Sequence, residues 1–278
     1  MTNTELPHVT LTLTRYSEPD ALVKLALAHA LAQADVTGEV LFIEQQGSSS
    51  IDASNFPDAK LDLRVVRRQL SGLSAARNLA LREAENALVM FLDSDALAAP
   101  DFARRLASEL KQPDVAVAGA RILPQWPQRQ PVLAKARAVY DQYSLLDMGE
   151  QTQDYHRVVG AGFGVDMGKL PADFLFDENL GRRDGRLFGG EESDFTNRAK
   201  ALGFRSTYVG RAQVTHVIEP ERTQLRWIVN RLIYAGHGRA MMGGVPAPAG
   251  KRTLADWLLA PLYVPPYLIG WLWGKLSH

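Results

Sequence analysis

Residues 70–102 read LSGLSAARNLALREAENALVMFLDSDALAAPDF, and this stretch decides the fold. Leu73 to Ala80 follows a Ser- and Gly-punctuated start with a helical pattern. The next run, residues 87–92 (ALVMFL), has the length of a strand and is apolar throughout, which predicts a strand buried on both faces. It stops at Asp93-Ser94-Asp95. Carboxylates that follow a buried strand lie at the ligand-binding edge of an open α/β sheet.

Asp93 and Asp95 are two residues apart, so on an extended backbone their side chains point the same way. Carboxylate oxygens suit a hard divalent cation and the phosphates that such a cation carries. An isolated Asp-x-Asp is usually only a solvated turn. The buried strand and the Arg77-Asn78 helix before it make a ligand site the better interpretation here.

This stretch resembles the family-two glycosyltransferases with the GT-A fold. The matching residues are Gly72–Asn78 (GLSAARN) and Phe91–Asp95 (FLDSD), and the resemblance extends over residues 9–240. It implies an α/β fold with a mostly parallel central sheet flanked by helices, to which this chain adds an apolar helical tail. The motifs are specific for the fold and the reaction class but weak for the donor and the acceptor.

Composition limits the other functions. The 278 residues are 46% hydrophobic, enough for a large core, and 31 basic residues balance 31 acidic ones. Without a basic excess we expect no nucleic-acid partner. The absence of cysteine excludes a disulfide framework, a thiolate metal site and a cysteine nucleophile. The first seven residues lack the features of a signal peptide, so we expect a cytoplasmic protein.

The first 120 residues predict the nucleotide-binding half. Strands are expected at 8–14, 39–44, 61–66, 87–92 and 114–120, and helices at 19–34, 74–85 and 100–111. Strand, helix and strand in this order imply right-handed crossovers and a parallel sheet.

Residues 121–242 are expected to form the acceptor-binding half of a GT-A domain spanning 1–242. Prolines make 121–131 rigid and averse to helix. The patterns then predict helices at 132–146, from 189 onward and at 220–240, strands at 158–165, 205–209 and 213–216, and a loop at 149–154.

The resemblance implies where the nucleotide binds. Tyr16 and Glu18, after the first strand, and Glu44, at the end of the second, would hold the base and the ribose. In this chain two glutamines separate Glu44 from Gly47, where the family usually has a pair of acids. That departure bears on which base is bound more than on the fold.

Further donor contacts come from the same resemblance. Arg77 would reach the nucleotide, unless it makes only an ion pair on its helix. Asp93 would act through the ribose or a metal-bound water. Gly162 belongs to a Gly-rich strand that would lie beside the donor sugar, since such glycines let a ligand come close.

Asp95 and His216 are the expected metal ligands. His216 follows a short strand at a position where the family often supplies a ligand. A carboxylate, an imidazole and diphosphate oxygens suit Mn²⁺ or Mg²⁺, and the imidazole favours Mn²⁺.

The catalytic base is expected at the start of a helix. Gly190-Glu191-Glu192 matches the family's acidic motif, in which the second acid is the base, here Glu192 in place of the commoner Asp. An acid at a helix start is held in its charged form and can accept a proton. Asp194 is the alternative if the register differs. One base without a nucleophilic partner implies a single displacement with inversion.

Trp126 would stack on the acceptor sugar or pack in the core, and Arg182, Arg183 and Arg186 would close over the diphosphate or form a solvated loop. The predicted function is an inverting glycosyltransferase that moves a sugar from a nucleotide-diphosphate donor to a hydroxyl of a carbohydrate or lipid-linked acceptor. Synthesis of cell-surface polysaccharide or glycolipid is the expected setting.

Two other functions remain as alternatives. A sugar-nucleotide-forming nucleotidyltransferase shares the α/β plan, but residues 14–19 lack the Gly-rich basic loop that such enzymes need. A nucleotide- or carbohydrate-binding module with a decayed site fits the two glutamines and Glu192, but Asp95 and His216 argue against it.

Residues 243–278 differ in character from the rest. A Gly-, Pro- and Ala-rich linker, 243–250, precedes an uncharged stretch, 257–274. Its prolines at 261, 265 and 266 predict two short segments joined at 264–266. Trp257, Tyr263, Tyr267, Trp271 and Trp273 favour a membrane–water boundary, and Arg252 and Lys275 would meet anionic headgroups. We expect the tail to lie on the inner face of the cell membrane, or to pack on the domain or on a dimer partner.

Overall fold

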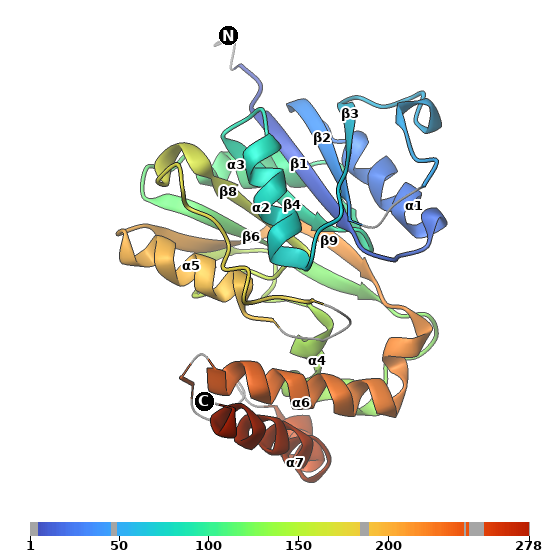
Figure 1. Cartoon of the computed structure of the whole chain (residues 1–278), viewed down its shortest axis with the longest axis vertical. Coiled ribbons are helices and arrows are strands. Elements are labelled where there is room, and N and C mark those ends of the chain that lie inside the picture. Colours follow the sequence, from blue (N-terminus) through green and yellow to red (C-terminus); the bar gives the residue numbers. More distant parts are fainter. Residues whose placement is uncertain (1–4, 46–48, 184–188, 242, 245–252, 278) are drawn as a thin grey trace.

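A computed structural model describes residues 5–45, 49–183, 189–241, 243–244 and 253–277. Its centre is a nine-stranded sheet with helices on both faces, and a pair of helices lies beyond one end of the sheet (Figure 1). The strands are β1 (His8–Arg15), β2 (Thr37–Glu44), β3 (Asp62–Arg67), β4 (Leu88–Asp93), β5 (Ala96–Ala98), β6 (Val115–Gln125), β7 (Thr152–Asp154), β8 (Gly162–Asp166) and β9 (Arg205–Val217). The helices are α1 (Asp20–Leu31), α2 (Leu73–Glu83), α3 (Phe102–Leu110), α4 (Arg137–Tyr140), α5 (Glu191–Ala201), α6 (Leu225–Met241) and α7 (Leu254–Leu276).

The sheet is parallel in its first half and mixed in its second. Its order is β3-β2-β1-β4-β8-β6-β9-β5, with β7 also paired to β9. The first four strands are parallel, as the crossover argument predicts. Strand β8 runs antiparallel to both β4 and β6, β6 and β9 are parallel, and β5 and β7 run antiparallel to β9, so the second half of the sheet is mixed. Strand β6 crosses residue 120 and both halves share one sheet, so the division at that residue stays a prediction.

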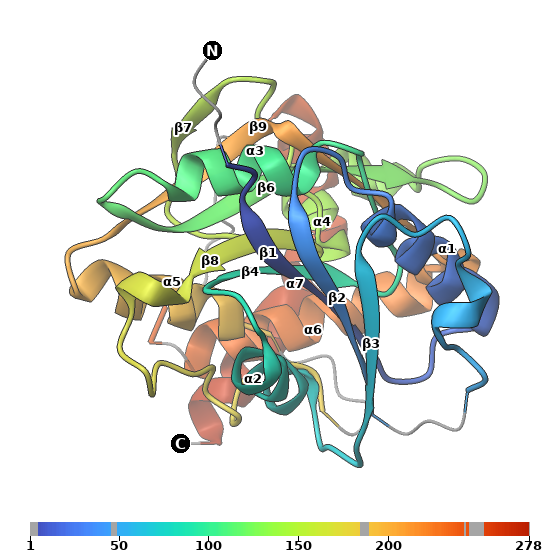
Figure 2. The same ribbon diagram turned by 90° about the horizontal axis from the view of Figure 1, so that it is seen from above.

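Two apolar layers hold the helices on the sheet (Figure 2). One contains the buried faces of α1 and α3, and the other contains those of α2 and α5. In the second layer Phe91 stacks on Phe163, with ring centroids 4.8 Å apart, and Phe176 stacks on Phe195 at 4.4 Å. Burial of such rings is the main contribution to the stability of the layer.

The proline-rich stretch after residue 120 continues β6 instead of ending it. The Ile122 N–H donates to the Leu146 carbonyl, on the side of β6 that faces away from β9. Pro124, two residues on, faces the same side, so its missing N–H costs no hydrogen bond to β9.

The single helix predicted over 132–146 is wrong. The chain forms a 3₁₀ turn at Val132–Lys135, the four-residue α4 and a second 3₁₀ turn at Asp141–Tyr143. Ala136 is extended, with φ −74° and ψ 130°, and Ser144 has φ 56°, so both interrupt the helix. The other differences are smaller: β7 replaces part of the expected loop, β9 is one strand where two were expected, and residues 220–223 form a 3₁₀ turn before α6.

The two-segment tail is also wrong, because α7 is one helix that contains all three prolines. Thr253 and Asp256 form a capping box at its start. Along its length α7 packs on α6 with the two backbones in contact: a Cβ on Gly270 would lie 1.8 Å from the Ile233 carbonyl oxygen, and one on Gly236 would lie 2.0 Å from that of Tyr267. An interior proline costs about 3 kcal/mol, and this packing offsets the cost.

The tail has two further features. No helix within the described ranges combines the length and the apolar character needed to cross a bilayer. Residues 245–250 of the linker, and Arg252 after it, lie outside the described part of the chain.

Candidate functional site

A cavity of about 500 Å³ opens where β1, β4 and β9 end and where α2 and α5 begin. Helix α6 and the turn before it close another side. The cavity brings together residues that are far apart in the sequence, and the predicted site residues among those that line it are Tyr16, Glu18, Arg77, Asp93, Asp95, Arg182, Arg183, Glu191 and Glu192.

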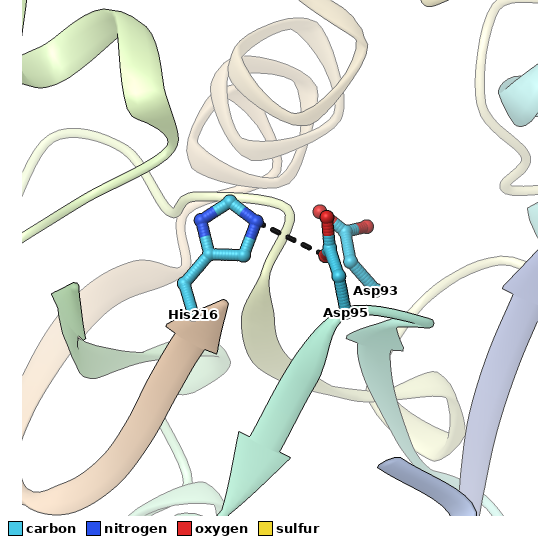
Figure 3. Close-up of side chains that lie close together, drawn as sticks. All are labelled: Asp93, Asp95 and His216. Carbon is cyan, nitrogen blue, oxygen red and sulfur yellow. Dashed lines mark ion pairs between the residues drawn. The ribbon is translucent and has the colours of Figure 1, made fainter. Parts of the chain in front are cut away.

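Asp93, Asp95 and His216 form one group of possible metal ligands (Figure 3), of which Asp93 and Asp95 line the cavity. Asp93 ends β4, and Asp95 follows two residues later. His216 lies in β9 directly opposite Ala96 of β5, which places its ring beside Asp95. One ligand atom from each residue lies within 4.8 Å of the others.

The hydrogen bonds of His216 leave a lone pair directed at Asp95. His216 Nδ1 lies 2.8 Å from the Tyr143 carbonyl oxygen, which can only accept, so Nδ1 carries the proton. Nε2 of the neutral ring is then an acceptor, and it lies 3.0 Å from Asp95 Oδ1. Neither Nε2 nor Oδ1 has a hydrogen-bond partner within the described chain. Two buried acceptors this close need a second proton or a cation between them, and a metal-binding histidine commonly donates its other N–H to a carbonyl.

The two aspartates are held differently. Burial opposes the charge on Asp95, but without a metal a second proton on the facing His216 ring, together with Arg222, whose Nη2 lies 3.1 Å from Oδ2, would hold its pKa below the ordinary value. Burial raises the pKa of Asp93 despite the opposing effect of Arg77, and the neighbouring Asp95 raises it further. A divalent cation would reverse that repulsion between the carboxylates. The donor set and its orphaned atoms therefore fit a divalent metal.

Arg77 of α2 is the centre of a second charged cluster. Its guanidinium is 2% exposed, with Nη1 3.0 Å from Glu192 and 3.2 Å from Glu191, and with Nη2 3.5 Å from Asp93. The backbone of Gly160 lies close against the Arg77–Glu192 ion pair, since a Cβ on Gly160 would lie 2.2 Å from Glu192 Oε1. One cation thus serves three carboxylates, and its predicted contact with the nucleotide stays a prediction.

The two glutamates have opposite pKa shifts. Burial and the neighbouring Glu192 raise the pKa of Glu191 to about 8. Burial also disfavours the charge on Glu192, but Arg77 and a backbone N–H at the start of α5 lower its pKa below the ordinary value. At neutral pH the proton of the pair therefore sits on Glu191, and Glu192 is the ionised carboxylate facing the cavity.

Besides His216, which is buried beside Asp95, four predicted site residues do not line the cavity. Glu44 is 2% exposed and bridges Arg15 at 3.1 Å and Arg67 at 2.9 Å, so it holds the ends of β1, β2 and β3 together. In its place, Gln45 lines the cavity.

The other three have structural partners. Gly162 lies inside the sheet opposite Leu92, Trp126 meets Tyr143 edge-on at 5.0 Å, and Asp194 pairs with Arg198 at 2.8 Å. Residues 46–48 and Arg186 lie outside the described ranges.

Sequence reasoning missed three arginines in the second half of the chain. Arg157, Arg222 and Arg231 all line the cavity. Arg222 lies six residues after His216, in the 3₁₀ turn that starts at Pro220. This short separation from His216 in the sequence is the signal that could have identified it. Burial and the nearby Arg182 lower the pKa of Arg231 to about 10, which indicates a crowded positive region.

Comparison with known proteins identifies the class. The chain is 24% identical over 178 residues to a glucosyl-dolichyl phosphate glucuronosyltransferase of Haloferax volcanii, which covers 62% of this chain and 56% of that protein. It is 32% identical over 104 residues to the succinoglycan biosynthesis protein ExoO of Rhizobium meliloti, covering 37% of this chain and 29% of that protein. The chain thus spans about half or less of the length of these relatives.

The fold is similar to that of a solved structure, GalNAc-T7 with UDP, GalNAc and Mn²⁺. The TM-score is 0.61 at 12% identity, over 99% of this chain and 57% of the other. The architecture is therefore the GT-A α/β fold expected from the sequence. The model of the family described as glycosyl transferase family 2 matches residues 26–170, slightly more than half of the chain and including Arg77, Asp93 and Asp95. This chain belongs to glycosyl transferase family 2.

Proposed function

We propose that the protein is a metal-dependent, inverting glycosyltransferase that moves a sugar from a nucleotide-diphosphate donor to a hydroxyl of an acceptor. The observation that carries the proposal is the placement of Glu192, ionised by Arg77, in the cavity that Asp93 and Asp95 also line, with His216 buried beside Asp95. A cation site for a diphosphate and a base for a hydroxyl are the two provisions that this transfer needs.

Asp95 and His216 would hold the metal, with Asp93 beside it. Carboxylate and imidazole ligands suit Mn²⁺ or Mg²⁺, and the imidazole favours Mn²⁺. When bound, the ion supplies positive charge opposite the leaving diphosphate. The similar fold solved with UDP and Mn²⁺ supports this assignment.

Glu192 would act as the base. Its carboxylate accepts the proton of the acceptor hydroxyl as that oxygen bonds to the anomeric carbon of the donor. The bond from that carbon to the diphosphate oxygen breaks, and the nucleoside diphosphate leaves with the electron pair. Displacement from the opposite face without a covalent intermediate inverts the anomeric configuration. Arg77 keeps Glu192 ionised, and the neutral Glu191 avoids a second negative charge.

The remaining cavity residues would hold the two substrates. Tyr16, Glu18 and Gln45 at the ends of β1 and β2 would contact the base and the ribose. Arg182 and Arg183, which lie over the cavity beside Gly72, would contact the diphosphate, since guanidinium groups bind phosphate oxygens in pairs. Trp227 lines the cavity, whereas Trp126 does not, so Trp227 replaces it as the ring for stacking on a sugar.

The names of the relatives support an acceptor in envelope synthesis, either a carbohydrate or a lipid-linked sugar. We further propose that the protein lies on the inner face of the cell membrane through α7. The outward face of that helix is apolar over its whole length, with exposed residues at helical spacing: Leu254, Leu258, Leu262, Ile269, Leu272 and Leu276. Such a face, with aromatic residues beside it, is typical of a helix that lies in the membrane interface.

A test separates this function from a nucleotidyltransferase and from a decayed binding module. The full chain is incubated with a panel of nucleotide sugars, with Mn²⁺ or with a chelator, and free nucleoside diphosphate is measured. A transferase releases nucleoside diphosphate only with metal. Release of pyrophosphate from a nucleoside triphosphate and a sugar phosphate would instead indicate the nucleotidyltransferase, and binding without turnover would indicate the module.

A further inference from the structure

A second cavity of about 470 Å³ lies between α6 and α7, beside the first. Figure 1 shows these two helices packed side by side beyond the end of the sheet. Six residues line both cavities, so the two adjoin at the start of α5: Asp141, Arg157, Gly189, Gly190, Ser193 and Arg231.

One wall of this second cavity is apolar and aromatic. Trp257, Ala260, Tyr263, Val264 and Tyr267 lie on one face of α7 and line the cavity, opposite residues of α6 that include Leu232 and Tyr234. Trp257 is also 63% exposed and adjoins the outward apolar face of α7. The cavity therefore opens at the edge of the surface that we propose faces the membrane.

The other side of the cavity is basic. Arg157, Arg231 and Arg239 line it. Arg157 has a buried Nε without a hydrogen-bond partner in the described part of the chain. The guanidinium of Arg239 is exposed and makes neither an ion pair nor a hydrogen bond with the residues that the structure describes.

The two carboxylates of the cavity are already used. Asp141 pairs with Arg137 at 2.8 Å and with Arg157 at 3.5 Å. Asp256 accepts the N–H of Thr253 at 2.7 Å and that of Ala138 at 3.1 Å, which fixes the start of α7. Within the described ranges, the cavity therefore has the unpaired guanidinium of Arg239 and the unbonded Nε of Arg157 on one side and an apolar wall on the other, and this combination recognises an amphiphilic anion.

We propose, on the basis of the function proposed above, that the second cavity binds the acceptor and that the acceptor is a lipid carrying a phosphate. The phosphate lies against Arg157, Arg231 and Arg239, because arginine forks bind phosphate oxygens in pairs. The lipid chain lies along the α7 wall and leaves past Trp257. The sugar on the phosphate extends past Gly189 and Gly190 to Glu192.

The α7 wall argues against a plain polysaccharide acceptor. A saccharide chain needs hydroxyl partners along its length, whereas Ala260 and Val264 separate the aromatic rings of this wall and the Tyr263 hydroxyl already donates to the Asp256 carbonyl. Burying sugar hydroxyls against these side chains would cost hydrogen bonds to water. An isoprenoid or acyl chain has no such cost and gains from the burial.

The test uses farnesyl phosphate as a short lipid phosphate, with farnesol and inorganic phosphate as its two separated parts, in calorimetric titrations of the full chain below micelle-forming concentrations. We expect farnesyl phosphate to bind at least roughly tenfold more tightly than either part, since its binding gains from charge-assisted hydrogen bonds and from burial of the chain. Arg239→Gln should weaken farnesyl phosphate binding by about tenfold. Arg226→Gln, on the same helix but outside the cavity, should leave it unchanged. Trp257→Ser, at an exposed position, should weaken farnesyl phosphate and leave inorganic phosphate as it was.

The proposal is overturned by equal affinities for farnesyl phosphate and farnesol, by the absence of farnesyl phosphate binding, or by equal effects of Arg239→Gln and Arg226→Gln. Metal-dependent release of nucleoside diphosphate, measured on the same preparations, reports separately on the proposed function. If farnesyl phosphate fails to bind while that release persists, the acceptor inference alone is wrong. If the release fails in every variant and in the unmodified chain, the proposed function is wrong.

Discussion

The guanidinium of Arg77 lies 3.0 Å from the Glu192 carboxylate although the two residues are 115 positions apart in the sequence. Arg77 comes from the helix before β4, and Glu192 comes from the first turn of α5. The ion pair therefore links the helix that precedes Asp93 and Asp95 to the helix that carries the candidate base.

Glu192→Gln keeps the shape of the side chain but cannot accept a proton. General-base catalysis contributes about 10²–10⁴ in rate, so we expect sugar transfer to fall by that factor while donor binding stays nearly intact. Asp194→Asn is the matched control and should transfer normally, because Asp194 pairs with Arg198 outside the cavity. Loss of transfer in Asp194→Asn with normal transfer in Glu192→Gln would assign the base to Asp194.

Asp95→Ala should abolish metal-dependent binding of nucleoside diphosphate, and His216→Ala should weaken it. Both changes remove an atom of the group that lies within 4.8 Å. Calorimetric titration with and without Mn²⁺ measures the effect, and Asp58→Ala, an exposed aspartate elsewhere, is the control. Unchanged affinity in Asp95→Ala would exclude this metal site.

Arg77→Met should destabilise the protein by roughly 3–5 kcal/mol, because it leaves buried carboxylates without their counter-charge. Urea denaturation at neutral pH measures the free energy of unfolding. The double variant Arg77→Met with Glu192→Gln should recover part of the loss, since one of the unpaired charges is removed. A decrease in the free energy of unfolding below about 1 kcal/mol is typical of a solvent-exposed ion pair and would contradict the burial of the Arg77 ion pairs.

Glu191 gives the protein a pH dependence of stability that can be isolated. Its folded pKa of about 8 exceeds its ordinary value of 4.5, so between these pH values the folded protein binds a proton that the unfolded chain has lost. Stability from this group is complete below about pH 4.5 and falls as pH rises toward 8, by up to about 1.4 kcal/mol per pH unit. Metal-free urea denaturation from pH 5 to 8 should show a shallower fall in Glu191→Gln than in the unmodified chain. Equal slopes would mean that Glu191 is ionised in the folded protein.

Membrane association should depend on the outward face of α7. We expect the full chain to float with anionic liposomes and the double variant Leu258→Glu and Ile269→Glu to stay in the soluble fraction. Both side chains are more than half exposed, so we expect the double variant to fold normally. Leu202→Glu, an exposed leucine outside α7, is the control and should float. Flotation of the double variant, or failure of the unmodified chain to float, would exclude this surface.

The sequence predicts the parts of the site that lie at strand and helix ends. Asp93, Asp95 and Glu192 follow or begin elements with clear patterns, and parallel strands bring such ends to one edge of the sheet. Glu44 fits the same rule, but Arg15 and Arg67 neutralise it, and no local pattern shows which charges will pair across neighbouring strands. The fold class was predictable for the same reason, since strand, helix and strand dictate a parallel first half.

The parts that sequence reasoning missed depend on contacts between distant segments. Pro265 and Pro266 break an isolated helix, but packing of Gly270 and Gly274 on α6 restores it. Conversely, the periodicity over 132–146 fits a helix, but the chain turns at Ala136 and Ser144 and reaches the second cavity through Asp141. The arginines of that cavity have no motif because two separate segments contribute them, the loop with Arg157 and helix α6.

The anchoring of α7 by Asp256 bears on how the protein is made. Of the elements described here, α7 leaves the ribosome last, whereas β4, which ends at Asp93, emerges more than 150 residues earlier. The nascent chain can therefore assemble the ends of β1 and β4 while the wall formed by Trp257 and Tyr267 does not yet exist. During synthesis, the proposed donor site therefore forms before the surface that we propose binds the lipid. The two lie side by side only after α7 has been added.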